Sequence, residues 1–418
     1  MSGDASPSDK PAGRSLVFRS AAAVAALVLT AAAAAPNHAA AEGDSGKAQS
    51  FWLHLDSTPI TDAEIATHAH EQSYVVLNAW EGDLAGKFKN ANPQIRVFVY
   101  KDLSSTRAYA CENGQDDARI PTGVGFCAAD QAHPDWFLTD GGGKRFEYSG
   151  YQGHWQMDVG NTAYQDAWGD NVIASAKEGG FDGVLMDNAL FACDTYHEGV
   201  CPAAYPTDEA FQNAYKSMLS NLRGRFADAG LLTVANLANA RLHPGAWDAY
   251  TEYLDGGFDE WWLAFGKGDL LPEGADGWSA QADQIASDEA RGKITWVQPH
   301  VTPDDDRSFR YAMASYFLVQ GGRTAIAATV GRDEYGDPAP SRAEYDWDLG
   351  DATGPYRTVG KNLLVRDFTC GMVVVNTNPS VSGEVRVDLG VLHRDEQERS
   401  VASVSLAGTS GSILRRPC

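Results

Sequence analysis

The segment from Asn161 to Asn188 constrains the fold more than any other part of the chain. Its first part, 161–178, carries apolar and aromatic residues at helical spacing, and Gly179-Gly180 ends that pattern. The apolar run Val184–Met186 is typical of a short buried strand, and it ends at Asp187. A helix followed by a buried strand is half of an α/β repeat. The segment therefore predicts a parallel sheet covered by helices.

The same alternation of apolar runs and helical patterns extends over most of the chain. Eight strands are predicted, at 51–56, 73–80, 94–102, 181–187, 231–239, 256–262, 293–301 and 323–329. The helices predicted between them are 61–72, 84–90, 161–178, 207–229, 244–254, 277–291 and 305–320. This order predicts an α/β fold, a (β/α)8 TIM barrel over 51–330. An open doubly wound sheet is the alternative, but no Gly-x-Gly-x-x-Gly turn follows any strand.

The alternation breaks at about 103–160, where two cysteines, a glycine triplet and several aromatic residues occur. We expect a hairpin at 135–158, inserted at the carboxyl face of the barrel. A long structured loop on that face usually shapes a substrate site. Its aromatic side chains would either stack on sugar rings or cover the barrel rim, and the sequence does not separate these two roles.

The composition changes after Thr329, and residues 331–418 are predicted to form a small C-terminal antiparallel β domain. The first part, 331–356, is loop-like. Short strands are then predicted at 363–366, 371–376, 383–389 and 401–406. No periodic aromatic stripe runs through them, so support of the barrel is favoured over an independent sugar-binding role.

The N-terminus has the order of a secretory signal peptide. Residues 1–19 are polar with three basic side chains, 20–36 form an uncharged alanine-rich run, and the small residues 39–41 precede an acidic stretch. We predict a signal peptide at 1–41, a polar linker at 42–50 and a secreted, extracellular protein. A retained membrane anchor is the alternative, but the apolar run is shorter than a spanning helix usually is.

Six cysteines follow, and an even number in an exported protein indicates disulfides rather than catalytic thiols. Pairing of sequence neighbours, one of 15 possible arrangements, predicts the disulfides Cys111–Cys127, Cys193–Cys201 and Cys370–Cys418. No C-x-x-C or H-E-x-x-H spacing occurs, so we predict neither a metal site nor a cofactor. The run Asp304–Asp306 is interpreted as the N-cap cluster of the following helix rather than as a metal site.

The formal net charge is −23, and loss of 1–41, with its three basic and two acidic residues, leaves −24. Such an acidic surface repels phosphate groups, so neither nucleic acid nor a membrane is expected as a partner of the mature chain. A neutral or cationic substrate fits better, although acidity also serves the solubility of an exported protein. We expect a monomer.

Hydrolysis of a glycosidic bond needs two carboxyl groups that flank it, one protonated and one ionised. Acids lie at or near the carboxyl ends of several predicted strands, namely Asp56, Glu81, Asp102, Asp187 and the adjacent Asp259 and Glu260. Asp187 ends the strongest predicted strand, and strands four and six face the same central cleft. A barrel strand is buried on both faces, so the pattern leaves open which acid of strand six is used. An acid after a strand is also often a helix cap or a turn former.

Polar and aromatic residues at or near the strand ends are candidates for binding sugar hydroxyl groups. The predicted substrate-binding residues are Asp56, Asn78, Trp80, Tyr100, Lys101, Asn188, Asn236, Asp259, Trp262, Gln298 and His300. Each of them taken alone is also compatible with a structural role.

Several stretches resemble a known group of proteins. They are SYVVLNAW, VFVYKD, DVGNTAYQDAWGDNVIASAKEGGFDGVLMDN, GGFDEWW and the late YDWDLGDATGPY with VRDFTCGMVVVNTNP. They resemble the uncharacterised glycosyl-hydrolase-like TIM-barrel families and, more remotely, the endo-α-1,4-polygalactosaminidase group, over roughly 51–390. The resemblance implies that Asp187 is the strand-four carboxylate, a nucleophile or stabilising base, and that Glu260 is the acid of strand six.

The sequence thus predicts a secreted glycoside hydrolase that cleaves a glycosidic bond in a poly- or oligosaccharide with the catalytic pair Asp187 and Glu260. The alternative is a non-catalytic polysaccharide-binding or cell-envelope protein on the same barrel. A phosphodiesterase barrel is disfavoured by the acidic charge and by the lack of clustered histidines.

Overall fold

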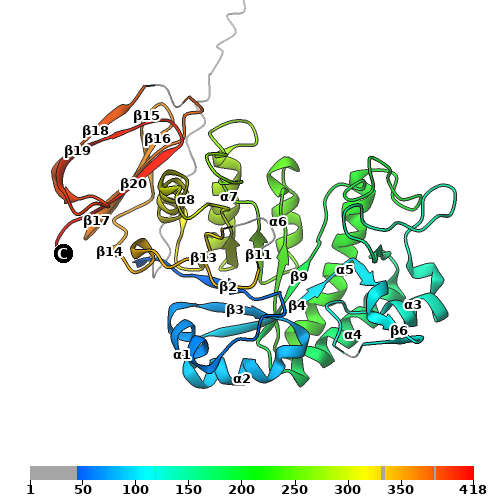
Figure 1. The fold of residues 1–418 in the computed structure, drawn as a ribbon. Coiled ribbons are helices and arrows are strands. Elements are labelled where there is room, and N and C mark those ends of the chain that lie inside the picture. Colours follow the sequence, from blue (N-terminus) through cyan, green and yellow to red (C-terminus); the bar gives the residue numbers. More distant parts are fainter. Residues whose placement is uncertain (1–44, 118, 331–334, 381–382) are drawn as a thin grey trace, which may run out of the picture. The chain divides into compact units, whose positions relative to one another are not determined.

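Figure 1 shows the computed structural model of the chain, which describes residues 45–117, 119–330, 335–380 and 383–418. The predicted signal peptide and the start of the predicted linker lie outside the described residues. Within these described ranges, no helix combines the length and the apolar character that a membrane crossing requires.

Eight parallel strands form one sheet in the order β13-β12-β11-β10-β9-β4-β3-β2. The end strands approach each other, because the Ile326 amide of β13 donates to the Gln49 carbonyl just before β2, at 2.9 Å. The sheet is thus a nearly closed barrel, and the predicted (β/α)8 fold is confirmed. Each predicted strand contains one of the observed strands, which are β2 (Phe51–Leu53), β3 (Tyr74–Leu77), β4 (Arg96–Asp102), β9 (Gly183–Asp187), β10 (Leu232–Asn236), β11 (Gly256–Asp259), β12 (Ile294–Val297) and β13 (Thr324–Ile326).

Helices alternate with these strands, and local sequence signals set their ends. Thr61 caps α1, because its hydroxyl accepts from the Glu64 amide while the Glu64 carboxylate accepts from the Thr61 amide. α5 ends at Gly230, whose φ of 72° favours glycine. The helices are α1 (Asp62–Glu71), α2 (Gly82–Ala91), α4 (Thr162–Glu178), α5 (Asp208–Ala229), α6 (Ala246–Thr251), α7 (Trp278–Ala290) and α8 (Asp306–Val319). Short 3-10 turns lie at Ala79–Glu81, Ala108–Ala110, Pro134–Trp136, Ala240–Leu242 and Ala343–Tyr345.

Aromatic side chains fill the interior of the barrel. The Trp296 ring of β12 stacks on Phe51 with centroids 5.4 Å apart and meets Phe98 edge-on at 5.0 Å. Leu185 and Phe258 pack in the same buried cluster. The interior is therefore a packed core, which leaves the strand ends as the place for a ligand.

A long excursion connects β4 to α4, at the place where the alternation of the sequence breaks. Its elements are β5 (Ser105–Arg107), β6 (Cys111–Glu112), β7 (Gln115–Asp116), α3 (Phe126–Ala132) and β8 (His154–Gln156). β5 pairs antiparallel with β8, and isolated bridges join Phe137 to Met157 and Glu147 to Trp155. The excursion therefore folds back on itself beside the ends of the strands.

The three predicted disulfides are confirmed. Cys111–Cys127 ties the start of the excursion, Cys193–Cys201 closes the loop after β9, and Cys370–Cys418 joins the end of the chain to the C-terminal sheet. Three disulfides indicate an oxidising compartment.

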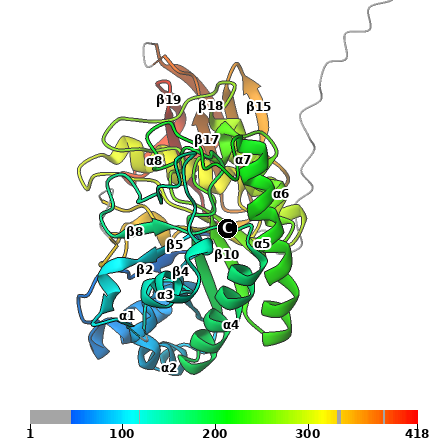
Figure 2. The ribbon, with the colours of Figure 1, turned by 90° about the vertical axis from the view of Figure 1, so that its right-hand side faces the viewer.

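The C-terminal region is a curled antiparallel sheet in the order β15-β16-β17-β20-β18-β19. Gly411 of β20 lies tightly against α8, since a Cβ there would come within 2.5 Å of Ala314 Cβ. β1, in the stretch predicted as a linker, pairs with β14 in the stretch predicted as a loop. The four strands predicted for this region correspond to β16, β17, β18 and β19, and the prediction missed β14, β15 and β20. The observed strands are β1 (Ser45–Lys47), β14 (Asp348–Asp351), β15 (Arg357–Gly360), β16 (Leu363–Phe368), β17 (Gly371–Asn376), β18 (Val385–Arg394), β19 (Ser400–Leu406) and β20 (Ser410–Arg415). Figure 2 gives the barrel and this sheet in a second view.

Candidate active site

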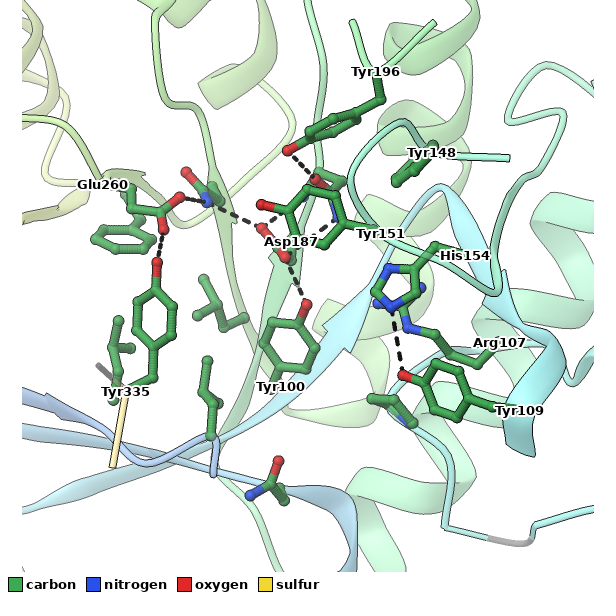
Figure 3. Close-up of a pocket in the computed structure, with 18 of the residues that line it drawn as sticks. Tyr100, Arg107, Tyr109, Tyr148, Tyr151, His154, Asp187, Tyr196, Glu260 and Tyr335 are labelled. Carbon is green, nitrogen blue, oxygen red and sulfur yellow. Dashed lines mark hydrogen bonds between the residues drawn. The ribbon is translucent and has the colours of Figure 1, made fainter. Parts of the chain in front are cut away.

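A cavity of about 340 Å³ opens at the carboxyl ends of the barrel strands (Figure 3). Its floor comes from the ends of β2, β4, β9, β10 and β11, and the excursion and the loop after β9 supply one wall. Both predicted catalytic acids, Asp187 and Glu260, line it.

Asn236, at the end of β10, links these two acids. Its Nδ2 donates to Asp187 Oδ1 at 3.0 Å and to Glu260 Oε2 at 2.7 Å. An amide nitrogen carries two hydrogens, so each acid receives one. Because one atom contacts both carboxylates, these two oxygens lie at most about 5.7 Å apart, the sum of the 3.0 and 2.7 Å distances. The ends of three different strands thus bring the two acids together.

Neutral hydrogen-bond donors surround Asp187. The Tyr100 hydroxyl donates to Oδ2 at 2.6 Å, and the Asn188 amide donates to Oδ1 at 2.8 Å. Burial, with repulsion from the Asp102 and Glu260 carboxylates, raises the pKa of Asp187 to about 6, although its hydrogen bonds act in the opposite direction. Asp187 is therefore ionised above this pH and protonated below it.

Glu260 directly follows β11, and its side chain enters the cavity. Its Oε1 accepts a hydrogen bond from the Tyr335 hydroxyl (Figure 3). Behind it, the His300 ring stacks on Trp261 at 4.0 Å, and His300 Nε2 lies 2.7 Å from the backbone oxygen of Glu260. These contacts fix both the main chain and the carboxylate of Glu260.

Asp259, the other acid of this strand, faces the helix layer. Its carboxylate accepts from the Trp261 amide at 3.1 Å and from Gln281 Nε2 of α7 at 2.8 Å, and the residue is 1% exposed. Burial raises the pKa of Asp259 to about 7. Neighbouring residues of a strand point to opposite faces, so Glu260 is the acid that meets the cavity.

Asp102 ends β4 and is the register partner of Asp187 on β9. Arg107 Nη2 donates to its Oδ2 at 2.9 Å, in an ion pair whose side chains are 4% and 0% exposed. Asn188 Nδ2 donates to the same oxygen at 2.8 Å. The charge of Asp102 is therefore matched by a buried cation.

Three exposed aromatic side chains gather around the cavity. Trp80, Tyr109 and Tyr151 are 40%, 59% and 47% exposed, and all three line it. No other tryptophan, tyrosine or phenylalanine in the described parts of the chain is exposed to this degree. Exposed rings beside a cavity with a few polar groups are typical of a ligand-binding surface.

Further rings form the wall on the side of the excursion. Tyr196 stacks on Tyr148 at 4.6 Å, and Tyr151 meets Tyr196 edge-on at 5.4 Å. His154 lies beside them, where burial and the nearby Arg107 charge lower the pKa of His154 to about 4. Its imidazole is therefore neutral at neutral pH.

The structure brings five of the predicted substrate-binding residues to the cavity, and these are Asn78, Trp80, Tyr100, Asn188 and Asn236. The other six do not line it, and these are Asp56, Lys101, Asp259, Trp262, Gln298 and His300.

Side-chain direction explains the residues that stay outside. Lys101 alternates with Tyr100 on β4 and points outward, where its Nζ donates to the Ile120 carbonyl at 2.8 Å and burial lowers its pKa to about 8. Trp262 is a buried core residue. Asp56 turns away into a hydrogen bond with the Thr58 amide at 2.9 Å.

Two other residues support the site from beneath. Gln298 is fully buried, and its Nε2 donates to the Thr329 hydroxyl at 3.0 Å. His300 is also buried and acts on the backbone of Glu260 rather than facing the cavity.

Several cavity residues follow no predicted strand and were not among the predicted substrate-binding residues. They are Arg107, Tyr109, Tyr148, Tyr151, His154, Tyr196 and Tyr335. Five of them, Arg107, Tyr109, Tyr148, Tyr151 and His154, lie in the excursion, whose aromatic content was the available signal. Tyr335 had none, because it reaches Glu260 from 75 residues further along the chain.

A candidate metal group in the described parts of the chain is Cys111, Asp116 and Cys127, whose ligand atoms lie within 4.8 Å of one another. The two sulfur atoms are bonded to each other. They are therefore not thiolates, and this group does not fit a metal.

Comparison with protein families gives one match. The model described as hypothetical glycosyl hydrolase family 15 (GHL15) matches residues 89–372, about two thirds of the chain. The sequence matches no curated protein.

Solved structures of glycoside hydrolases resemble the chain. A noncanonic maltogenic α-amylase, AmyB from Thermotoga neapolitana, is 11% identical, with 89% of this chain and 99% of that chain covered and a TM-score of 0.52. The glycoside hydrolase domain of PelA from Pseudomonas aeruginosa is 15% identical, with 70% and 98% covered and a TM-score of 0.45. At these identities the likeness to AmyB supports the barrel fold alone.

Proposed function

The chain belongs to the hypothetical glycosyl hydrolase family 15, and from this premise we propose that it is a glycoside hydrolase with Asp187 as nucleophile and Glu260 as general acid and base. The family implies a carbohydrate substrate. The three disulfides agree with secretion, which we also propose, together with action on a poly- or oligosaccharide outside the cell.

The observation that carries this proposal is the short distance between the two acids. Asn236 holds oxygens of Asp187 and Glu260 at most about 5.7 Å apart, by its 3.0 and 2.7 Å hydrogen bonds. Retaining glycosidases place their carboxyl groups about 5 to 5.5 Å apart, and inverting enzymes leave about 6.5 to 9.5 Å for a water molecule. The spacing favours a retaining reaction.

In the proposed first step, an Asp187 oxygen attacks the anomeric carbon while Glu260 gives its proton to the glycosidic oxygen. The glycosidic bond breaks, one sugar leaves as an alcohol, and the other forms an ester with Asp187. In the second step Glu260 takes a proton from water, whose oxygen attacks the anomeric carbon and releases Asp187. Two displacements restore the original anomeric configuration.

The cavity lining fits this substrate class. The exposed rings of Trp80, Tyr109 and Tyr151 offer flat apolar faces to the C–H faces of sugar rings. The same rings would serve the second candidate function, a protein that binds a polysaccharide without cleaving it. Binding alone does not require two acids held this close together by one amide, so hydrolysis is favoured.

The test is a screen of the secreted protein, residues 42–418, against α- and β-linked polysaccharides, including amino-sugar polymers. Release of reducing ends is expected from at least one, and Asp187→Asn and Glu260→Gln should each abolish it. Asp259→Asn is the matched control, because this neighbouring acid faces α7, and it should keep turnover. Full activity of both site variants would refute the assignment. Glycan binding in calorimetry without any reducing ends would favour the binding protein.

A further inference from the structure

The residues Tyr335 and Gly336, called the strap below, lie across the end of β2. The Tyr335 hydroxyl points at Glu260 and donates to its Oε1 (Figure 3). A hydrogen bond to a carboxylate both orients it and favours its ionised form. The position of the strap therefore bears on the acid that we propose to exchange protons with the substrate.

Three donors from β2 and the residues after it hold the strap. The Leu55 amide donates to the Tyr335 carbonyl at 2.6 Å. The Gly336 carbonyl accepts from Trp52 Nε1 at 2.8 Å and lies 2.9 Å from His54 Nδ1. The strap is thus held by the Trp52 indole of β2 and by a ring and a backbone amide of the residues that follow β2.

Gly336 approaches the side chain of Asp56 closely. A Cβ on Gly336 would lie 2.1 Å from Asp56 Oδ2 and 2.7 Å from its Cγ, so a larger residue would require the Asp56 side chain to move. The close approach agrees with a strap that is held in one position.

His54 is the member of this clamp that contacts both the strap and a buried acid. Its Nδ1 faces the Gly336 carbonyl, and its Nε2 lies 3.1 Å from Glu81 Oε1. Neither a carbonyl nor an ionised carboxylate has a hydrogen to give, so this pair of acceptors favours a ring that carries a proton on both nitrogens. The Asp56 carboxylate, 3.9 Å from Nδ1, adds to this preference.

The surroundings of His54 leave the ring little freedom. His54 is 1% exposed and Glu81 8% exposed. The second oxygen of Glu81 accepts from the Asn78 amide at 2.9 Å, which fixes its carboxylate. Burial acts to lower the pKa of His54, but the hydrogen bonds with Glu81 and Gly336 outweigh it and raise the pKa above its ordinary value.

We propose that His54 is a positioning residue, which holds Tyr335 against Glu260 by bridging Glu81 and the Gly336 carbonyl. This inference rests on the proposed function in one respect: Tyr335 matters for turnover only if Glu260 acts on the substrate. The clamp itself can be tested without any substrate.

The test combines His54→Gln, Tyr335→Phe and the double variant. Hydrogen–deuterium exchange of the Leu55 amide reports the strap, because this amide donates to Tyr335. His54→Gln should speed this exchange at least tenfold, whereas Tyr335→Phe should leave it unchanged. His68→Gln is the matched control, since His68 also packs edge-on against Trp52, at 5.3 Å, and is bonded to Glu71, but does not touch the strap. His68→Gln should change neither the exchange of the Leu55 amide nor the turnover.

Turnover of the polysaccharide found in the screen gives the second readout. Tyr335→Phe should lower kcat about 10- to 100-fold with little change in KM, the size expected for one hydrogen bond to a charged group. His54→Gln should lower kcat in the same way but by no more than Tyr335→Phe, and the double variant should match Tyr335→Phe alone. If the two effects multiply instead, His54 acts by another route and the proposal is wrong.

If His54→Gln does not fold, Glu81→Gln weakens the same clamp from its other end and should speed Leu55 exchange by a smaller factor. Unchanged exchange at Leu55 in whichever variant folds would overturn the clamp, whether or not a substrate is known. Faster exchange together with no hydrolysis of any polysaccharide by the wild-type protein would instead count against the proposed function. The two failures are thereby distinct.

Discussion

Asp102 and Asp187 end neighbouring strands and are register partners, yet their surroundings differ in charge. Asp102 is fully buried and paired with the Arg107 guanidinium at 2.9 Å. Asp187 is half-buried at the cavity, and its donors among the described residues are neutral, the closest being the Tyr100 hydroxyl at 2.6 Å. At the same level of the sheet, Asp102 thus has a bonded cation, whereas Asp187 has none in the part of the chain that the structure describes.

The difference separates an acid whose charge is balanced by a buried cation from an acid that faces the cavity and accepts from neutral donors. A buried carboxylate with a bonded cation has its charge compensated within the protein, so it has little to offer a substrate. A carboxylate with neutral donors only keeps its basicity, and burial raises the pKa of Asp187 to about 6. Asp102 also contributes to this rise, because its own negative charge acts on Asp187. Asp102 therefore helps to set the pKa of Asp187.

The largest expected effect comes from Asp187→Asn. If Asp187 is the nucleophile, kcat should fall by at least about 10³-fold, since the covalent step is lost. The melting temperature at pH 7.5 should stay the same or rise. A carboxyl whose pKa is raised on folding destabilises the native state once it is ionised, and this cost sets in as the pH rises from the unfolded value toward 6. Thermal unfolding and steady-state rates, measured on the same preparation, check both statements.

The opposite pattern is expected of Asp102→Asn. Loss of one partner leaves the buried Arg107 charge uncompensated, which should lower the free energy of unfolding by about 3 to 5 kcal/mol. Urea denaturation of the double variant Asp102→Asn/Arg107→Met should show partial recovery, because the stranded charge is gone. Asp166→Asn, which breaks an exposed pair with Arg225, should cost less than about 1 kcal/mol. A stable Asp102→Asn protein would show that the comparison with Asp187 is misplaced.

The sequence predicts the position of both aspartates but not this difference between them. Buried apolar runs locate the strand ends, so an acid at each end follows from periodicity alone. Arg107 lies in an excursion with no regular period, and its approach to Asp102 depends on the pairing of β5 with β8. No local pattern encodes that contact.

Side-chain direction is the second feature that the pattern leaves open. Asp259 and Glu260 are adjacent, and a strand buried on both faces gives no apolar alternation to tell them apart. The resemblance implied Glu260, and the structure places its side chain in the cavity. Because of the same ambiguity, Lys101 was predicted to bind substrate, but its side chain points away from the cavity. Tyr335 depends on the fold as a whole, because it meets Glu260 across 75 residues.

The smallest expected effect concerns the proton of Asp187. A nucleophile must be ionised, so kcat/KM should fall as the pH drops through about 6, the pKa of Asp187. Tyr100→Phe removes a donor that favours the ionised form, and the pKa should therefore rise further. The acid limb of the pH profile should move to higher pH by up to about two units, since one hydrogen bond to a charged group is worth about 1.5 to 3 kcal/mol.

Tyr205→Phe is the control for this shift. Its hydroxyl also donates to an aspartate, Asp158 at 2.5 Å, but neither residue lines the cavity. The acid limb of this variant should coincide with that of the wild-type protein. A limb that moves to lower pH in Tyr100→Phe, or moves equally in both variants, would mean that the titrating group is not the carboxylate bonded to Tyr100. The titration seen in the acid limb would then have to be assigned to another acid of the cavity. Glu260, the other acid bonded to Asn236, would be the next to test.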